Sequence, residues 1–158
     1  MDPVDTSHLI QTVLIYALPV LFAITVHEAA HGYVARFFGD NTAWSMGRVT
    51  LNPIKHIDPI GTIVMPLMLY IATAGTFLFG YAKPVPVQFG NLRKPKQHMV
   101  WVALAGPGAN FIQALLWGAV FYMATAAGVT ERFVLEMCRA GTLVLVPIFL
   151  FLLSPRSP

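Results

Sequence analysis

Long apolar runs limit what this chain can fold into more than any other feature of its sequence. Of its 158 residues, 56% are hydrophobic and only 11% are charged, whereas a soluble domain usually carries about 25% charged residues. Several runs approach the roughly 20 residues that a helix needs to cross a bilayer. A soluble protein of this length would need a more polar surface than these residues can supply. The sequence therefore predicts an all-α membrane protein, a polytopic helical bundle.

Turn-forming residues and charged loops divide the apolar sequence into segments. The start of the chain is acidic and lacks Lys and Arg, unlike a signal peptide, so we expect the first segment to be retained as a membrane helix. The lone Cys138 excludes an internal disulfide and a cysteine zinc cluster. We predict a single membrane domain over residues 1–158, with hydrophobic segments at about 9–38, 60–81, 99–127 and 133–153.

The loop after the first segment carries a different pattern. Residues 46–52 alternate polar and apolar side chains, and Pro53 follows them. Alternation of this kind has the period of a strand. We therefore expect a short β-hairpin after the first helix.

The distribution of basic residues predicts the topology. The loops at residues 36–58 and 83–98 both carry an excess of Lys and Arg, and such loops favour the cytoplasmic side. Segment 60–81 lies between them and is interrupted by Pro66, Gly75 and Gly80. A re-entrant segment would keep both loops on one side, and irregular backbone is tolerated there if protein covers it. A plain transmembrane helix is the alternative; in either case we expect a multi-pass protein of the cell membrane.

The first apolar segment contains the motif His27-Glu28-Ala29-Ala30-His31. On a helix, residues i and i+4 lie one turn apart on the same face, so two imidazoles can reach one Zn²⁺. Glu28 is placed beside them to act as a general base on water rather than as a ligand. The motif therefore predicts a zinc site with His27 and His31 as ligands and Glu28 as the catalytic group.

The membrane setting strengthens this interpretation. Ionisable side chains at the centre of a membrane helix cost about 2.5–3.5 kcal/mol each by insertion scales and are usually functional. The alternative is that the motif lies in the membrane interface, where His and Glu cost little. The sequence from Gly32 to Phe38 is still mostly apolar, which favours the functional interpretation.

At the level of consecutive motifs, the sequence resembles the site-2 protease family. The blocks HEAAHGYVARFFGD, GRVTLNPIKHIDPIGT, FGYAKPVPV with NLRKP, and VALAGPGAN occur in collinear order over about residues 15–127. The resemblance implies an intramembrane zinc metalloprotease that hydrolyses peptide bonds in or near membrane-spanning segments of substrate proteins. It implies zinc ligands at His27 and His31, a catalytic Glu28, and a β-hairpin at about residues 47–52 that pairs with substrate or only lines the site.

One departure from the family pattern concerns the third zinc ligand. By resemblance, this ligand is an aspartate of an LDG-type motif on the last core helix. Here the corresponding region reads PIFLFLLSPRSP, and no Asp occurs after Asp58. We therefore expect a chain that is incomplete or divergent at its C-terminus, with weak zinc retention and impaired catalysis. A catalytically inactive homologue that binds membrane proteins on the same scaffold is the alternative function.

Two further residues are candidates for supporting roles. Asp58 has the right chemistry to replace the missing ligand, although capping a helix before Pro59 is the more common role for such a residue. Asn110 follows the break Gly106-Pro107-Gly108 and either faces the site or satisfies backbone groups in the membrane. As partners we expect membrane protein substrates and the lipid bilayer, and no nucleic acid.

Overall fold

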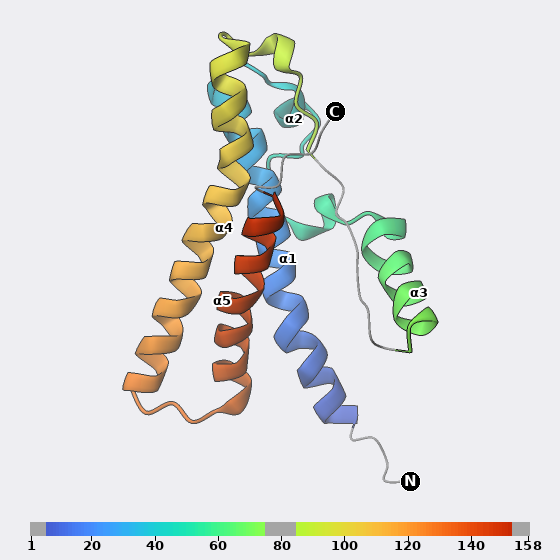
Figure 1. Cartoon of the computed structure of the whole chain (residues 1–158), viewed down its shortest axis with the longest axis vertical. Coiled ribbons are helices and arrows are strands. Elements are labelled where there is room, and N and C mark those ends of the chain that lie inside the picture. The colour runs from blue at the N-terminus through green and yellow to red at the C-terminus, as the bar shows by residue number, and fades with distance from the viewer. Residues whose placement is uncertain (1–5, 75–84, 153–158) are drawn as a thin grey trace. The chain divides into compact units, whose positions relative to one another are not determined.

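The structure, a computed structural model, describes the backbone of residues 6–74 and 85–152 and the side chains of residues 6–69, 71–74 and 85–142. Figure 1 shows that helices make up its regular structure. The α-helices are α1 (Thr6–Phe37), α2 (Thr42–Ser45), α3 (Met65–Ala72), α4 (Pro95–Ala126) and α5 (Arg132–Leu152). Short 3₁₀ turns occupy η1 (Pro53–His56) and η3 (Phe89–Asn91), and a π-helical turn occupies η2 (Pro59–Val64).

The chain divides into two compact units. One comprises Met1–His27 with Leu104–Pro158, and the other comprises Glu28–Ala103. Helices α1 and α4 each run from one unit into the other without interruption. The units are described separately below.

Three of the predicted apolar segments form helices close to their expected bounds. Segments 9–38, 99–127 and 133–153 correspond to α1, α4 and α5. Helix α1 continues through Pro19 and ends where Gly39 adopts a left-handed conformation with φ of 112°. The Gly39 and Asp40 amides donate to the carbonyls of Arg36 and Ala35, which satisfies the last turn as glycine commonly does at this position.

The predicted β-hairpin is wrong, because residues 6–74 and 85–152 contain no strand. Residues 46–52 instead form a turn and bends between α2 and η1. Their backbone groups are satisfied locally rather than by a neighbouring strand: the Arg48 amide donates to the Ala43 carbonyl at 2.9 Å, and His56 Nε2 donates to the Thr50 carbonyl at 3.0 Å. Alternation of polar and apolar residues indicates that one side of a segment is exposed and the other is covered. A strand also needs hydrogen bonds to a neighbouring strand.

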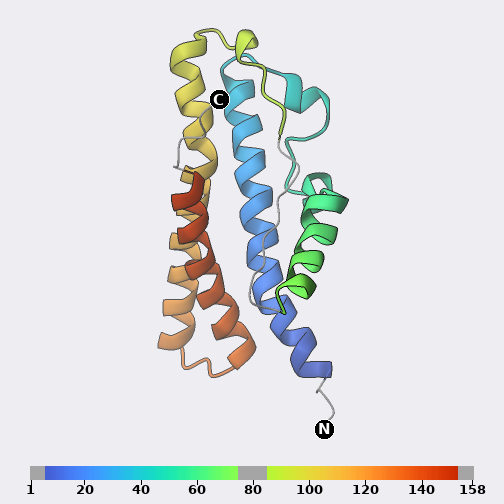
Figure 2. The same cartoon turned by 45° about the vertical axis from the view of Figure 1, so that its right-hand side comes forward.

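In the first unit, α5 lies beside the C-terminal part of α4 (Figures 1 and 2). A Cβ built on Gly141 of α5 would lie 2.5 Å from the indole of Trp117 on α4, so that a larger residue would displace the ring. At the next residue of each helix, a Cβ built on Gly118 of α4 would lie 3.8 Å from the Thr142 side chain. Small residues therefore allow these two apolar helices to approach, as is common between membrane helices.

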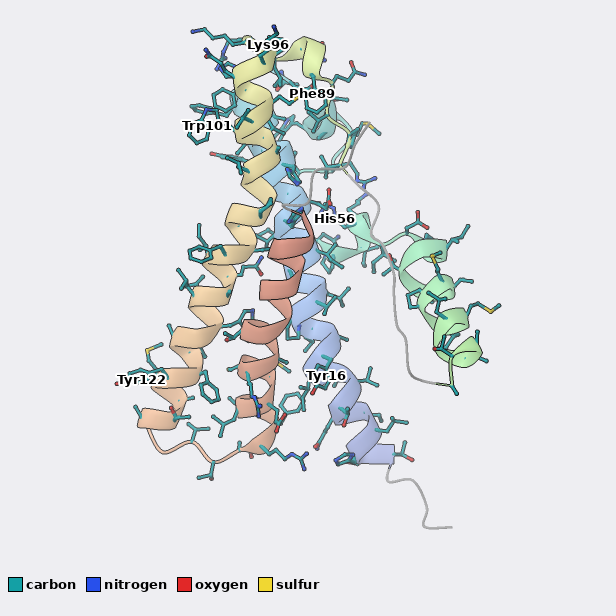
Figure 3. All side chains as sticks on the ribbon, in the orientation of Figure 1. Tyr16, His56, Phe89, Lys96, Trp101 and Tyr122 are labelled. Carbon is teal, nitrogen blue, oxygen red and sulfur yellow. The ribbon has the colours of Figure 1, made fainter. Side chains whose placement is uncertain are left out.

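Two helices, α1 and α4, are long and apolar enough to cross a membrane, by length and composition. Only 22% of the most apolar window of each is buried within the protein, whereas the core helix of a soluble protein would be mostly covered. Large side chains of α4 instead face outward: Figure 3 shows Trp101 and Tyr122, which are 60% and 74% exposed. Burying apolar surface against lipid is favourable, so these helices indicate a membrane location.

Among the described residues of the fourth predicted segment, 60–81, the helix ends at Ala72. Its helical part spans η2 and α3, and a helix of that length rises about 20 Å. This is less than the roughly 30 Å of a bilayer's hydrocarbon core. Residues 75–81 of the segment lie outside the described residues, so the re-entrant path stays a prediction.

In the second unit, a fully buried carboxylate joins the end of α1 to a later loop. Asp40 Oδ1 accepts hydrogen bonds from the Thr42 amide at 3.0 Å and from the Asn91 side-chain amide at 3.3 Å. Its Oδ2 accepts from the Gln88 amide at 2.7 Å. Burial alone would raise the pKa of Asp40, but these hydrogen bonds, including one from the Thr42 hydroxyl, outweigh it and lower that pKa below its ordinary value.

Replacing this carboxylate should destabilise the second unit. Asp40→Asn turns one acceptor into a donor that faces the Gln88 or Thr42 amide, so we expect a loss of about 2–3 kcal/mol in unfolding free energy at pH 7. The measurement is denaturant unfolding followed by the fluorescence of Trp44 and Trp101.

The same contacts predict a pH dependence. A carboxylate whose pKa is lowered by folding adds stability above its unfolded pKa, near 3.8, and this contribution is lost as the pH falls below that value. The stability gap between wild type and Asp40→Asn should therefore shrink below about pH 4. A gap that stays constant down to pH 2 would show that the ionised carboxylate is not the stabilising group.

Candidate metal centre

The residues His27, Glu28 and His31 lie on helix α1, within its long apolar stretch. The helix geometry places His27 and His31 one turn apart along the same side. The His27 side chain is buried, with 5% exposed, while Glu28 and His31 are half-buried. The three ionisable groups therefore sit on regular helix and not in a loop, as the proposed zinc site requires.

A backbone carbonyl orients the ring of His31. His31 Nδ1 lies 2.6 Å from the Val102 carbonyl oxygen on α4. A carbonyl can only accept, so Nδ1 carries the hydrogen and Nε2 of the neutral ring carries the lone pair. Ligating histidines commonly donate their other ring N–H to a carbonyl in this way. The Val102 contact therefore selects the tautomer of His31 that can bind a metal through Nε2.

The buried side chain of Asn110 lies against His27. Asn110 Nδ2 is 3.1 Å from His27 Nδ1, and Asn110 Oδ1 in turn accepts from Gln113 Nε2 at 3.4 Å. In this arrangement the amide donates to Nδ1, which puts the ring hydrogen of a neutral His27 on Nε2. A rotation of the amide by half a turn would present Oδ1 to an Nδ1–H and leave the Nε2 lone pair for a metal. Asn110 is thus placed where its orientation affects which nitrogen of His27 carries the ring hydrogen.

The carboxylate of Glu28 has a backbone partner from a distant part of the sequence. The Val85 amide donates to Glu28 Oε2 at 2.8 Å, and the Val85 side chain is itself buried. This hydrogen bond ties one carboxylate oxygen to Val85, within the sequence KPVPV. The second carboxylate oxygen, Oε1, is the one considered below as the proton acceptor.

The two candidate supporting residues differ in their placement. Asn110 contacts His27 directly, as described above. Asp58 caps η2: its Oδ1 accepts from the Ile60 and Gly61 amides at 2.9 and 3.1 Å, and its own amide donates to the Thr62 hydroxyl. Asp58 is therefore the N-cap of η2, and the Thr62 hydroxyl accepts from the backbone amide of that cap. The structure thus places Asp58 in the capping role considered for it, and ligation by Asp58 stays a prediction.

The residues with described side chains contain no group of three His, Cys, Asp or Glu that could hold a metal ion. Imidazole is a common zinc ligand, and the spacing of His27 and His31 places both rings on the same side of the helix. At His31, the tautomer also has its hydrogen on Nδ1, so that Nε2 can bind a metal. Catalytic zinc sites usually have three protein ligands. The motif therefore supplies two of the expected three.

Sequence reasoning missed the two backbone groups that hold the site residues. Val85 N and Val102 O belong to ordinary apolar residues, whose side chains give no signal of such a role. His56, which lies in the GRVTLNPIKHIDPIGT block, is also buried, with 1% exposed. Its Nε2 donates to the Thr50 carbonyl, so it braces the loop that replaces the predicted hairpin.

Curated relatives are named as zinc metalloproteases. The chain is 46% identical over 99 residues to "Putative zinc metalloprotease YwhC" of Bacillus subtilis (strain 168), a match that covers 63% of this chain and 41% of that protein. It is 32% identical over 96 residues to "Putative zinc metalloprotease Rip2" of Mycolicibacterium smegmatis, which covers 61% of this chain and 35% of that protein. A Rip2 protein of Mycobacterium tuberculosis is 33% identical over 96 residues, with the same coverage.

The chain spans about two-fifths of the length of these relatives or less. No family model matches it, and no solved structure matches it significantly. The relatives' names agree with the zinc chemistry expected of His27, Glu28 and His31. The resemblance to the site-2 protease family is therefore confirmed by homologues that match about three-fifths of this chain.

Proposed function

We propose that this chain carries the zinc-binding and proton-transfer residues of an intramembrane metalloprotease. Its substrates would be membrane proteins, cut at peptide bonds in or near their membrane-spanning segments. The observation that carries the proposal is the His27-Glu28-Ala29-Ala30-His31 motif on the apolar helix α1, with hydrogen-bond partners on all three ionisable side chains.

The residues of the motif divide the chemistry between them. When bound, zinc would lower the pKa of water and polarise the scissile carbonyl. His27 and His31 would hold the metal, with Val102 and Asn110 orienting their rings. Glu28 would accept the proton of the attacking water and pass it to the leaving amine. The apolar surroundings of α1 would limit access of bulk water to this step.

The third ligand is the open part of this proposal. Among the acidic residues, Asp58 is the candidate named from sequence, and its Oδ1 is already used as a helix cap. If Asp58 also ligates, Asp58→Asn should release zinc, whereas capping alone should be nearly preserved because Asn is also a good cap. This single substitution separates the two roles.

We also propose that the chain crosses the membrane more than once, with the loops at residues 36–58 and 83–98 on the same side. The argument is the excess of Lys and Arg in both loops, together with the short helical part of the segment between them.

Single cysteines at Lys55 and Lys96, introduced into a Cys138→Ser background, would test this topology. Both residues are exposed and Cys138 is the sole cysteine. A membrane-impermeant maleimide should label both positions from the same side of sealed vesicles. Labelling from opposite sides would replace the re-entrant path by a plain crossing of segment 60–81.

The function itself is tested with the purified chain in liposomes that contain a single-pass reporter protein. Because weak zinc retention and impaired catalysis are expected of this chain, the proposal predicts slow cleavage within or beside the reporter's membrane segment when Zn²⁺ is added, and loss of this cleavage on chelation. Cleavage that survives chelation would overturn the metalloprotease proposal. Reporter binding without cleavage under all metal conditions would favour the inactive, membrane-protein-binding alternative.

A further inference from the structure

The hydrogen bond between Val85 and Glu28 lies in a proline-rich segment that has few backbone N–H donors. Proline has no backbone N–H, so Val85 contributes the sole amide hydrogen of the triplet Pro84-Val85-Pro86. That hydrogen is donated to Glu28 Oε2 at 2.8 Å. Three residues later, the Gln88 amide is donated to Asp40 Oδ2 at 2.7 Å. Two carboxylates in and just after α1 therefore hold the segment in place.

The packing around Val85 keeps this amide close to α1. The Val85 side chain is 8% exposed, and its Cγ1 would lie 3.2 Å from a Cβ placed on Gly32, one turn after Glu28. Glycine at position 32 thus lets the segment approach the face of α1 next to Glu28. Two contacts therefore hold Val85 against α1: the hydrogen bond from its amide to Glu28, and the packing of its side chain near Gly32.

A glutamate on a helix can adopt several side-chain rotamers, and a general base must keep one of them. A hydrogen bond to Oε2 restricts the carboxylate to rotamers that reach Val85. It also leaves Oε1 as the oxygen that can receive a proton. We propose that the Val85 amide is a positioning group for Glu28, which commits one carboxylate oxygen to the backbone and directs the other toward the reacting water. This inference rests on the proposed protease function.

The contact itself can be tested without any proteolysis. Amide hydrogen exchange of Val85 is measured in detergent micelles by NMR after selective ¹⁵N labelling of valine and glutamine. Glu28→Ala removes the acceptor and should speed exchange at Val85 at least about tenfold, whereas Glu28→Gln keeps an acceptor oxygen and should preserve most of the protection. The Gln88 amide, held by Asp40, should be unchanged in both variants. Equal Val85 exchange in wild type and Glu28→Ala would overturn the inference.

The positioning role is then tested in the cleavage assay. Val85→Pro removes the amide hydrogen in a segment already rich in proline, and it also fixes φ and alters the side-chain packing. It should lower kcat about 10–100-fold, since misplacing a reacting group by about 1 Å costs on the order of 10²-fold. KM and zinc content should not change. Val85→Ala keeps the amide and removes side-chain packing, so it should retain most of kcat.

Val87→Pro is the matched control, because the Val87 amide makes no hydrogen bond among those the structure describes for its segment. It should keep kcat within about threefold of wild type. If Val85→Pro lowers kcat no more than Val87→Pro does, the amide does not position Glu28. If no variant or wild type cleaves while exchange at Val85 responds to Glu28→Ala, the contact stands and the protease proposal fails.

Discussion

Glu28→Gln should lower kcat for cleavage of a membrane-spanning reporter about 10³-fold while leaving the zinc content of the chain unchanged. A positioned general base contributes about 10²–10⁴-fold to rate. The amide of Gln has nearly the same shape as the carboxylate and can still accept from the Val85 amide, but it cannot take a proton from water. The substitution therefore removes the proton transfer and little else.

The matched control for this prediction is Glu131→Gln, which makes the same chemical change at an exposed position before α5. It should cleave at close to the wild-type rate. Zinc content is measured by atomic absorption on the same preparations. Wild-type kcat in Glu28→Gln would remove Glu28 from the reaction, and loss of zinc in that variant would make Glu28 a ligand instead of a base.

The helices of this fold could largely be predicted from the sequence, because apolar length and proline or glycine positions are local properties. Segment 9–38 corresponds to α1, and Gly39 follows its end in a left-handed conformation. The loop at residues 46–52 could not be predicted in the same way. Its alternation of polar and apolar residues was real, but whether a strand forms depends on a pairing partner elsewhere in the chain.

The site shows the same division between local and distant determinants. His27, Glu28 and His31 could be proposed from spacing alone, because a helix fixes the relation between residues i and i+4. The partners that orient them come from residues 57 to 83 positions away: Val102 for His31, Val85 for Glu28 and Asn110 for His27. Of these, only Asn110 carries a polar side chain that sequence analysis could single out.

Substitutions at the site should lower zinc affinity by different amounts, most at the two histidines and less at Asn110. His27→Ala and His31→Ala each remove a proposed ligand and should leave little zinc on the purified chain. Asn110→Ala removes only a ligand's orienting partner, and such partners typically contribute about 10–100-fold in metal affinity. We therefore expect Asn110→Ala to bind zinc about 10–100-fold more weakly than wild type but still measurably. Competition with a chelator of known affinity gives these constants.

The hydrogen bonds of Asn110 allow a specific effect on zinc binding to be distinguished from a general loss of stability. Gln113 holds Asn110 Oδ1 at 3.4 Å, in the orientation that points Nδ2 toward His27. Gln113→Ala frees the amide to turn, so it should preserve or raise zinc affinity while Asn110→Ala lowers it. His8→Ala, at an exposed position of α1, is the histidine control and should bind zinc as wild type does. If Asn110→Ala and Gln113→Ala weaken zinc binding equally, the effect comes from packing in α4, and Asn110 does not select the ligating nitrogen of His27.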